Sequence, residues 1–179
     1  MRRFAIIVVA FLTTVYPALA RALTDAEKQS LVDTVAAYAK SIENHDVGFV
    51  TTVMSPKILQ ALADRSKMSV GQVKAIIVRQ IIEASSKAKL VSSQMDMEHA
   101  SYPQTQDGTP YVLIPTVTII ESADNRQFRS TTEMIAIEDD AKWYFVQVGD
   151  KVAVEVFKTV YPSFADVTFA PNKIVQTRQ

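Results

Sequence analysis

Cysteine is absent from the chain, and glycine occurs only four times in 179 residues. The absence of cysteine excludes disulfide bonds, thiol catalysis, a zinc–thiolate site and the lipidated cysteine of a bacterial lipoprotein. The scarcity of glycine disfavours a loop that holds phosphate through backbone amides, and no phosphate-loop, nucleophile-elbow or dinucleotide-binding motif occurs. No asparagine begins an N-glycosylation acceptor, so nothing indicates eukaryotic secretory processing.

Histidine is nearly absent as well, because His45 and His99 are the only two. Neither stands in a His-x-x-x-His or Glu-x-x-His spacing, which would place two ligands on one helical face, so we expect no metal and no cofactor. We expect His45 to be a cap or cation at a helix C-terminus. In a strand, Asp96 and Glu98 would share one face while His99 pointed to the other, which indicates a solvated strand edge rather than an acid–base pair.

The first twenty residues have the pattern of an export signal. Arg2 and Arg3 precede an apolar run over residues 4–15, and Ala18-Leu19-Ala20 has the small-x-small spacing that signal peptidase accepts. The run is shorter than the roughly 20 residues that span a bilayer, which favours cleavage over a stable membrane anchor. We therefore expect residues 1–20 to be a signal peptide and the mature protein to be soluble in the bacterial periplasm, with secretion as the alternative.

The composition of the mature chain limits its partners. Loss of Arg2 and Arg3 leaves 17 basic against 19 acidic residues, a formal net charge of −2. So small a charge indicates neither nucleic acid nor an anionic membrane as a partner. The remaining length suffices for one domain with a sizeable core, which we place at residues 21–171.

Helix signals dominate the first half of the mature chain. Thr24 and Glu27 have the spacing of a capping box, which predicts a helix that begins there and ends near residues 43–45. Pro56 suits the first turn of another helix, where its missing amide costs nothing. Ser69 opens a second capping box and a helix of about four turns. Apolar residues recur at three- and four-residue intervals in these segments, as on the buried face of a helix.

The second half has the composition and alternation of strands. We expect four strands, at residues 90–97, 111–120, 127–137 and 142–148. Short turns join the last three, which predicts an antiparallel meander and an α+β fold. Pro115 cannot donate to a ladder and indicates an edge or a bulge. Residues 150–161 fit a strand or a helix, and the flanking Gly149 and Pro162 favour a helix. We expect residues 172–179 to be a flexible C-terminal tail.

Three features of the sequence resemble the nuclear transport factor two-like superfamily over about residues 25–150. They are the order of elements, the break of a long helix into a shorter one between Tyr38 and Asp46, and the closing hairpin at residues 140–146. The resemblance implies a cone-shaped α+β fold, with N-terminal helices packed on a curved antiparallel sheet and a pocket between them. The superfamily includes ketosteroid isomerases, polyketide cyclases and many binding modules that catalyse nothing, so the fold alone does not decide the function.

The strand at residues 127–137 supplies two of the candidate site residues. Its even-numbered face carries small, hydroxylated and methionine side chains, among them Thr132 and Met134, which suit a concave face with a cavity. The other face ends in Ile135 and Ile137. That apolar patch could form a homodimer through the sheet face, as is usual in the superfamily, or it could be covered by residues 152–169.

Four residues are therefore the candidate ligand-binding set: Tyr38, Thr132, Met134 and Trp143. The chemistry of a ketosteroid isomerase needs a general base and a buried acid or phenol in one pocket, and no acidic residue can be matched to Tyr38. We therefore expect an exported, non-catalytic module that binds a small apolar or amphipathic ligand or a protein partner. The alternative is a small lyase or isomerase that acts on such a ligand.

The export signal gives the first testable prediction. The mature protein should begin at Arg21, and Ala20→Leu should block processing, because the large side chain does not fit the small-x-small site. Intact-mass analysis of periplasmic protein measures this. Retention of Met1 on the soluble form would contradict it.

Overall fold

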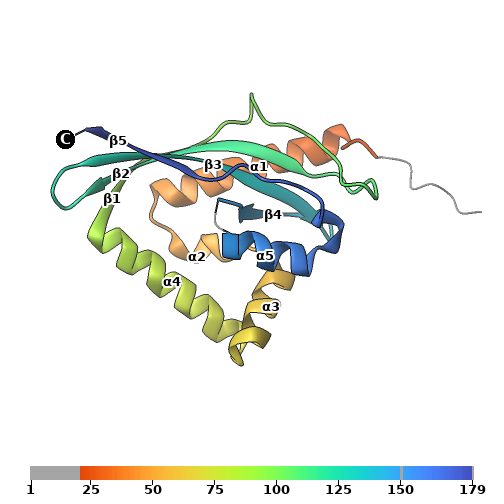
Figure 1. Cartoon of the computed structure of the whole chain (residues 1–179), viewed down its shortest axis with the longest axis horizontal. Coiled ribbons are helices and arrows are strands. Elements are labelled where there is room, and N and C mark those ends of the chain that lie inside the picture. Colours follow the sequence, from red (N-terminus) through yellow and green to blue (C-terminus); the bar gives the residue numbers. More distant parts are fainter. Residues whose placement is uncertain (1–20, 150, 179) are drawn as a thin grey trace, which may run out of the picture.

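The computed structural model describes residues 21–149 and 151–178, so the predicted signal peptide lies outside the described residues. The elements, in chain order, are α1 (Asp25–Glu43), α2 (Val47–Val50), α3 (Pro56–Ser66), α4 (Val70–Lys87), β1 (Ala88–Met95), β2 (Val112–Ser122), β3 (Gln127–Asp139), β4 (Lys142–Gln147), α5 (Lys151–Val160), the 3-10 helix η1 (Pro162–Phe164) and β5 (Lys173–Arg178). Figure 1 shows the long strands across the top of the molecule and α4 slanting away from them toward α3.

The chain has an α+β fold in which helices pack on a five-stranded antiparallel sheet. The strand order is β1-β2-β3-β4, and β5 also pairs with β3. The four predicted strands and the helix at residues 150–161 are confirmed in type, with small shifts of their ends. Both capping boxes are present, at Thr24 with Glu27 and at Ser69 with Gln72. None of the helices among the described residues is long and apolar enough to cross a membrane.

The C-terminal residues differ from the flexible tail that the sequence predicts. Residues 173–178 form β5, which pairs with the first half of β3, while β4 pairs with its second half. A hydrogen bond holds the start of β5, because Ser130 Oγ donates to Asn172 Oδ1 at 2.8 Å. Asn172 also passes close to the backbone of Gly149. A Cβ at Gly149 would lie 2.8 Å from both Asn172 Cβ and Thr132 Oγ1, so this crossing requires a glycine.

One face of the sheet is covered by α1. Its buried Leu31 and Val35 pack on the apolar side chains that β2, β3 and β4 present to that face. Trp143 of β4 is 4% exposed, and its Nε1 donates to the carbonyl oxygen of Glu27 at 3.2 Å. Trp143 therefore ties the closing hairpin to the first turn of α1. The buried members of this cluster are Leu23, Leu31, Val35, Val53, Val112, Ile114, Met134, Ala136, Trp143 and Phe145.

The opposite face is covered by the C-terminal segment. Phe157 of α5 and Phe164 of η1 are buried and pack in one cluster with Ile135 and Ile137. The two phenyl rings meet edge to face, with centroids 4.7 Å apart. Of the two alternatives for the apolar patch on β3, the structure has the second, because the C-terminal segment buries Ile135 and Ile137.

Pro115 lies in β2, which is a central strand and not an edge. Its carbonyl oxygen accepts a hydrogen bond from the amide of Asp96 at 2.8 Å, and the pairing of β1 with β2 ends at Met95 and Thr116. In an antiparallel pair the N–H and C=O of one residue face the same neighbour. The missing amide of Pro115 therefore faces the point where β1 gives way to an irregular segment, so the predicted irregularity is present without an edge.

The burial of Trp143 gives a stability prediction. Trp143→Ala should lower the free energy of unfolding by roughly 3 to 5 kcal/mol, because it leaves a cavity between β4 and α1 and removes the bond to Glu27. Denaturant melts measure this change, and the fluorescence of the native protein should be blue-shifted. A loss below about 1 kcal/mol would show that the indole does not fill the core.

Candidate functional site

The four predicted ligand-binding residues lie in or against the core. Met134 and Trp143 are buried members of the cluster beneath α1, and Thr132 is also buried. Tyr38 is half-buried, and its ring meets that of Phe145 edge to face, with centroids 5.6 Å apart. Burial raises the pKa of the Tyr38 phenol. The two cavities described below are lined by other residues, so sequence reasoning found the packed layer between α1 and the sheet but not the hollow beside it.

A carboxyl group of raised pKa beside Tyr38 would support catalysis. In the structure, the carboxyl group whose pKa is raised lies elsewhere. Burial, followed by the neighbouring Glu27, raises the pKa of Glu138. Arg21 Nη2 lies 2.5 Å from Glu27 and 3.7 Å from Glu138, and it holds the pKa of Glu27 well below its usual range. This cluster surrounds the N-terminal turn of α1, whereas Tyr38 is eleven residues further along the helix, about 16 Å away along its axis.

The segment after β1 also differs from the prediction. The strand ends at Met95, and residues 96–99 turn, so His99 Nδ1 lies 2.8 Å from Asp96 Oδ2. Asp96 Oδ1 accepts hydrogen bonds from the amides of Glu98 and His99, and these contacts with His99 lower the pKa of Asp96. The predicted sharing of a strand face by Asp96 and Glu98 is therefore wrong. Both members of the Asp96–His99 pair lie at the surface, where the pair closes the turn.

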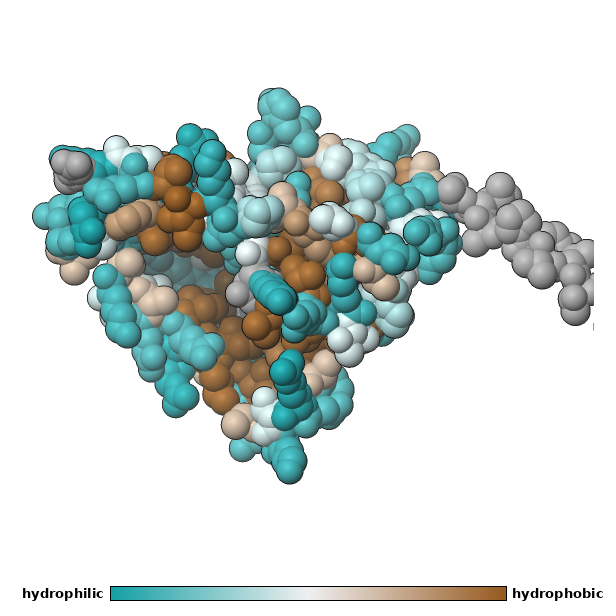
Figure 2. Space-filling view, in the orientation of Figure 1, coloured by the Kyte–Doolittle hydropathy of each residue, from teal (hydrophilic) through white to brown (hydrophobic). Residues whose placement is uncertain are grey.

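A hollow lies between α4 and the break from α1 to α2. We call it the α1–α4 cavity; its volume is about 480 Å³. Figure 2 shows apolar side chains inside the hollow beside α4 and polar side chains along its rim. The lining residues are Ser41, Ile42, His45, Asp46, Val47, Val50, Ile81, Ile82, Ser85, Lys89 and Leu90.

A local sequence signal creates one wall of this cavity, and the way α4 packs creates the other. Helix α1 ends at Glu43, and His45 follows with a left-handed φ of 54°, which turns the chain sharply. Asp46 then caps α2, because its Oδ1 accepts from the amide of Phe49 at 3.1 Å. On the other wall, α4 is anchored at its N-terminal part, where Val73 is its only buried residue. The rest of α4 leaves the core, and its apolar stripe faces a hollow instead of a packed layer.

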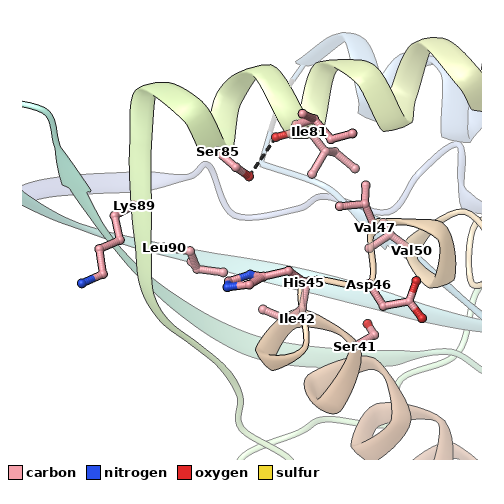
Figure 3. Close-up of a pocket in the computed structure, with 11 residues that line it drawn as sticks. Ser41, Ile42, His45, Asp46, Val47, Val50, Ile81, Ser85, Lys89 and Leu90 are labelled. Atoms are coloured by element: carbon pink, nitrogen blue, oxygen red, sulfur yellow. Dashed lines mark hydrogen bonds between the residues drawn. The ribbon is translucent and has the colours of Figure 1, made fainter.

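The side chains in the cavity divide into apolar walls and a few polar groups. In Figure 3, Ile81 comes from α4, and Ile42, Val47 and Val50 come from the opposite wall. Leu90 lies between the walls, with the His45 ring directed toward it. Two apolar surfaces with polar groups at the rim can bind a molecule whose body is apolar.

The hydroxyl groups of two serines that line the cavity donate hydrogen bonds within their own helices. Ser41 Oγ donates to the carbonyl oxygen of Tyr38 at 2.7 Å, and Ser85 Oγ donates to that of Ile81 at 2.9 Å. Both bonds lie within a helix. The serine oxygens can therefore only accept from a ligand.

A second hollow of about 400 Å³ lies between α3, β4 and α5. Its lining is almost wholly apolar and includes Ile58, Leu62 and Val156. The one hydroxyl in the lining belongs to Ser55, which is fully buried and lies 2.5 Å from the hydroxyl of Tyr161. This contact joins the start of α3 to the end of α5, and it leaves the exposed Gln147 as the one polar side chain of the lining that could reach a ligand.

Sequence reasoning assigned the residues of the α1–α4 cavity to other roles. It placed Ile81 on the buried face of a helix and His45 at a helix C-terminus. The adjacent pair Ile81-Ile82, like Ile76-Ile77 one turn earlier, is an available signal. Two large apolar neighbours on a helix point in different directions and cannot both face one core. Ile82 is 55% exposed.

Comparison with known proteins adds no relative, since no family model, curated protein or solved structure matches this chain. Among residues 21–149 and 151–178, no three histidine, aspartate or glutamate side chains converge as a metal site would require. The resemblance to the nuclear transport factor two-like superfamily therefore stays a prediction from the sequence, and the function has to be argued from the cavity.

The position of Tyr38 gives a prediction that separates structure from chemistry. Tyr38→Phe should change the free energy of unfolding by less than about 1 kcal/mol, because its hydroxyl has no hydrogen-bond partner among the described residues. Tyr38→Ala, the control, should cost about 2 kcal/mol or more, because it removes the ring from Phe145. Denaturant melts compare the two. If Tyr38→Phe were as costly as Tyr38→Ala, the hydroxyl would have an essential partner.

Proposed function

We propose that this protein binds a small apolar or amphipathic molecule in the α1–α4 cavity and does not transform it. The observation that carries the proposal is the cavity itself, about 480 Å³ in volume, with apolar walls from α1, α2 and α4. Ligand sites typically measure about 300 to 1,000 Å³ and combine an apolar lining with a few polar groups. The cavity fits both criteria.

The proposal of binding without catalysis rests on the groups that meet in the cavity. General acid–base catalysis needs a proton donor and an acceptor at hydrogen-bond distance from one reacting atom. His45 is the one titratable ring in the lining, and the adjacent Asp46 is engaged as the cap of α2. Glu138, the carboxyl group of raised pKa, lies by the other end of α1.

Energetics favour a ligand with a substantial apolar body. Each methylene group that leaves water contributes about 0.8 kcal/mol, while association costs roughly 4 kcal/mol or more in lost freedom. A chain of about eight to ten methylenes contributes roughly 6 to 8 kcal/mol, which offsets that cost and leaves a dissociation constant in the millimolar range, and about fifteen methylenes would be needed for micromolar affinity. A side chain or two of a protein partner would fill less of the cavity, so a small molecule is the ligand that we propose. Together with the predicted signal peptide, this makes the protein a periplasmic binding module, with secretion as the alternative.

Binding of an uncharged, environment-sensitive dye such as Nile red tests the proposal. Ile81→Gln should weaken dye binding about 10-fold, because it places an amide on the apolar wall. Val32→Gln is the matched control: Val32 is 43% exposed on α1 and does not line the cavity, so the dye affinity should not change. Equal affinities of the two variants, or no dye binding by the wild type, would contradict the proposal.

A further inference from the structure

We infer that the ligand of the α1–α4 cavity carries one cationic, hydrogen-bond-donating head group, as a primary alkylamine does. The inference rests on the function proposed above and adds the chemical class of the ligand. It follows from three observations on the cavity: what its polar atoms can accept, where its negative charge lies, and where its positive charge points.

Acceptors outnumber donors among the polar atoms of the lining. The hydroxyls of Ser41 and Ser85 are committed to helix carbonyl oxygens, so each can only accept from a ligand. Asp46 is an acceptor, with Oδ1 on the amide of Phe49 and Oδ2 without a hydrogen bond to another described residue. The imidazole of His45 supplies one donor and one acceptor when neutral. A head group rich in N–H donors satisfies this set better than a carboxylate does.

Negative charge gathers where α1 ends. The nineteen-residue helix α1 terminates at Glu43, next to the cavity, and the C-terminus of a helix carries the equivalent of about half a negative charge. Glu43 and Asp46 add two carboxylates to the same bend of the chain, and neither makes a salt bridge with a described residue. Lys40 in the last turn of α1 offsets the negative end of that helix. The two carboxylates still leave an excess of negative charge on this side of the cavity, which attracts a cation.

The cations at the other end of the cavity do not oppose this arrangement. Lys89 pairs across the sheet with Glu121, whereas its neighbour Leu90, which points into the cavity, pairs with Ile120. Successive residues of a strand point to opposite faces, so the Lys89 ammonium group is directed away from the hollow. Figure 3 shows its side chain extending outward from the mouth. Lys87 belongs to the last turn of α4, where it offsets the negative end of that helix.

Taken together, these contacts orient the ligand. Its apolar chain lies between Ile81 of α4 and Val47 and Val50 of the opposite wall. Its ammonium group lies at the bend between α1 and α2, where it donates hydrogen bonds to Asp46 and Ser41. The binding is wholly noncovalent.

Three probes of equal chain length test the inference: decylamine, decanol and decanoate, each below its micelle concentration and at pH 7.5. We measure their displacement of Nile red from the full mature protein. Decylamine should bind about 3- to 5-fold more tightly than decanol and about 10-fold more tightly than decanoate, as expected for charges near the surface.

The variant Asp46→Asn assigns the preference to the bend. Asparagine caps helices as well as aspartate does, so α2 should keep its cap while the charge is lost. The advantage of decylamine over decanol should fall to about 2-fold or less, while the affinity for decanol stays unchanged. Lys87→Gln is the control and should alter neither affinity, because Lys87 lies in the last turn of α4 and does not line the cavity.

The outcomes separate this inference from the proposed function. Decanoate binding as tightly as decylamine, or an Asp46→Asn variant that keeps the full preference for decylamine, would overturn the cationic head group and leave the apolar site intact. Failure of all three probes to displace the dye would overturn the proposed function itself.

Discussion

Burial of β3 on both faces is the constraint on which the rest of the structure depends. Its residues 134–137 are all buried, with alternate side chains on opposite sides of the sheet. Such a segment is stable only if both faces are covered, since each large apolar side chain left in water forgoes about 1.5 to 3 kcal/mol. Helix α1 covers one face, and α5 with η1 covers the other, so the two ends of the chain enclose the same strand.

The cavity results from which helices pack on the two faces of the sheet. Once α1 and α5 occupy the faces of the sheet, α4 has no sheet surface left to cover, and it packs mainly on α3 through Val73. It then returns to the sheet only at its end, where β1 begins directly after Lys87. The space between α4 and the bend at His45 and Asp46 is the hollow to which we assign ligand binding. Core and site are thus formed by the same helices, and the site lies where their packing is incomplete.

The local signals of the sequence predicted the elements well, because capping boxes, proline positions and alternation act within a few residues. Thr24 and Ser69 begin helices, as expected. Three features escaped prediction, and two of them, β5 and the cavity, depend on distant contacts. Residues 173–178 pair with β3 although their side chains are exposed, so no apolar pattern marks them. The Asp96–His99 contact requires a turn where a strand was expected. The cavity depends on the direction of α4, which the helical stripe around Ile81 does not encode.

A structure with bound ligand tests the central claim most directly. The mature protein should be crystallised with decylamine, and the position of the alkyl chain read from the electron density. We expect the alkyl chain between Ile81 and Val50, with its nitrogen at the bend beside Asp46. Density instead in the hollow between α3, β4 and α5, or between Tyr38 and the sheet, would contradict the assignment of the site.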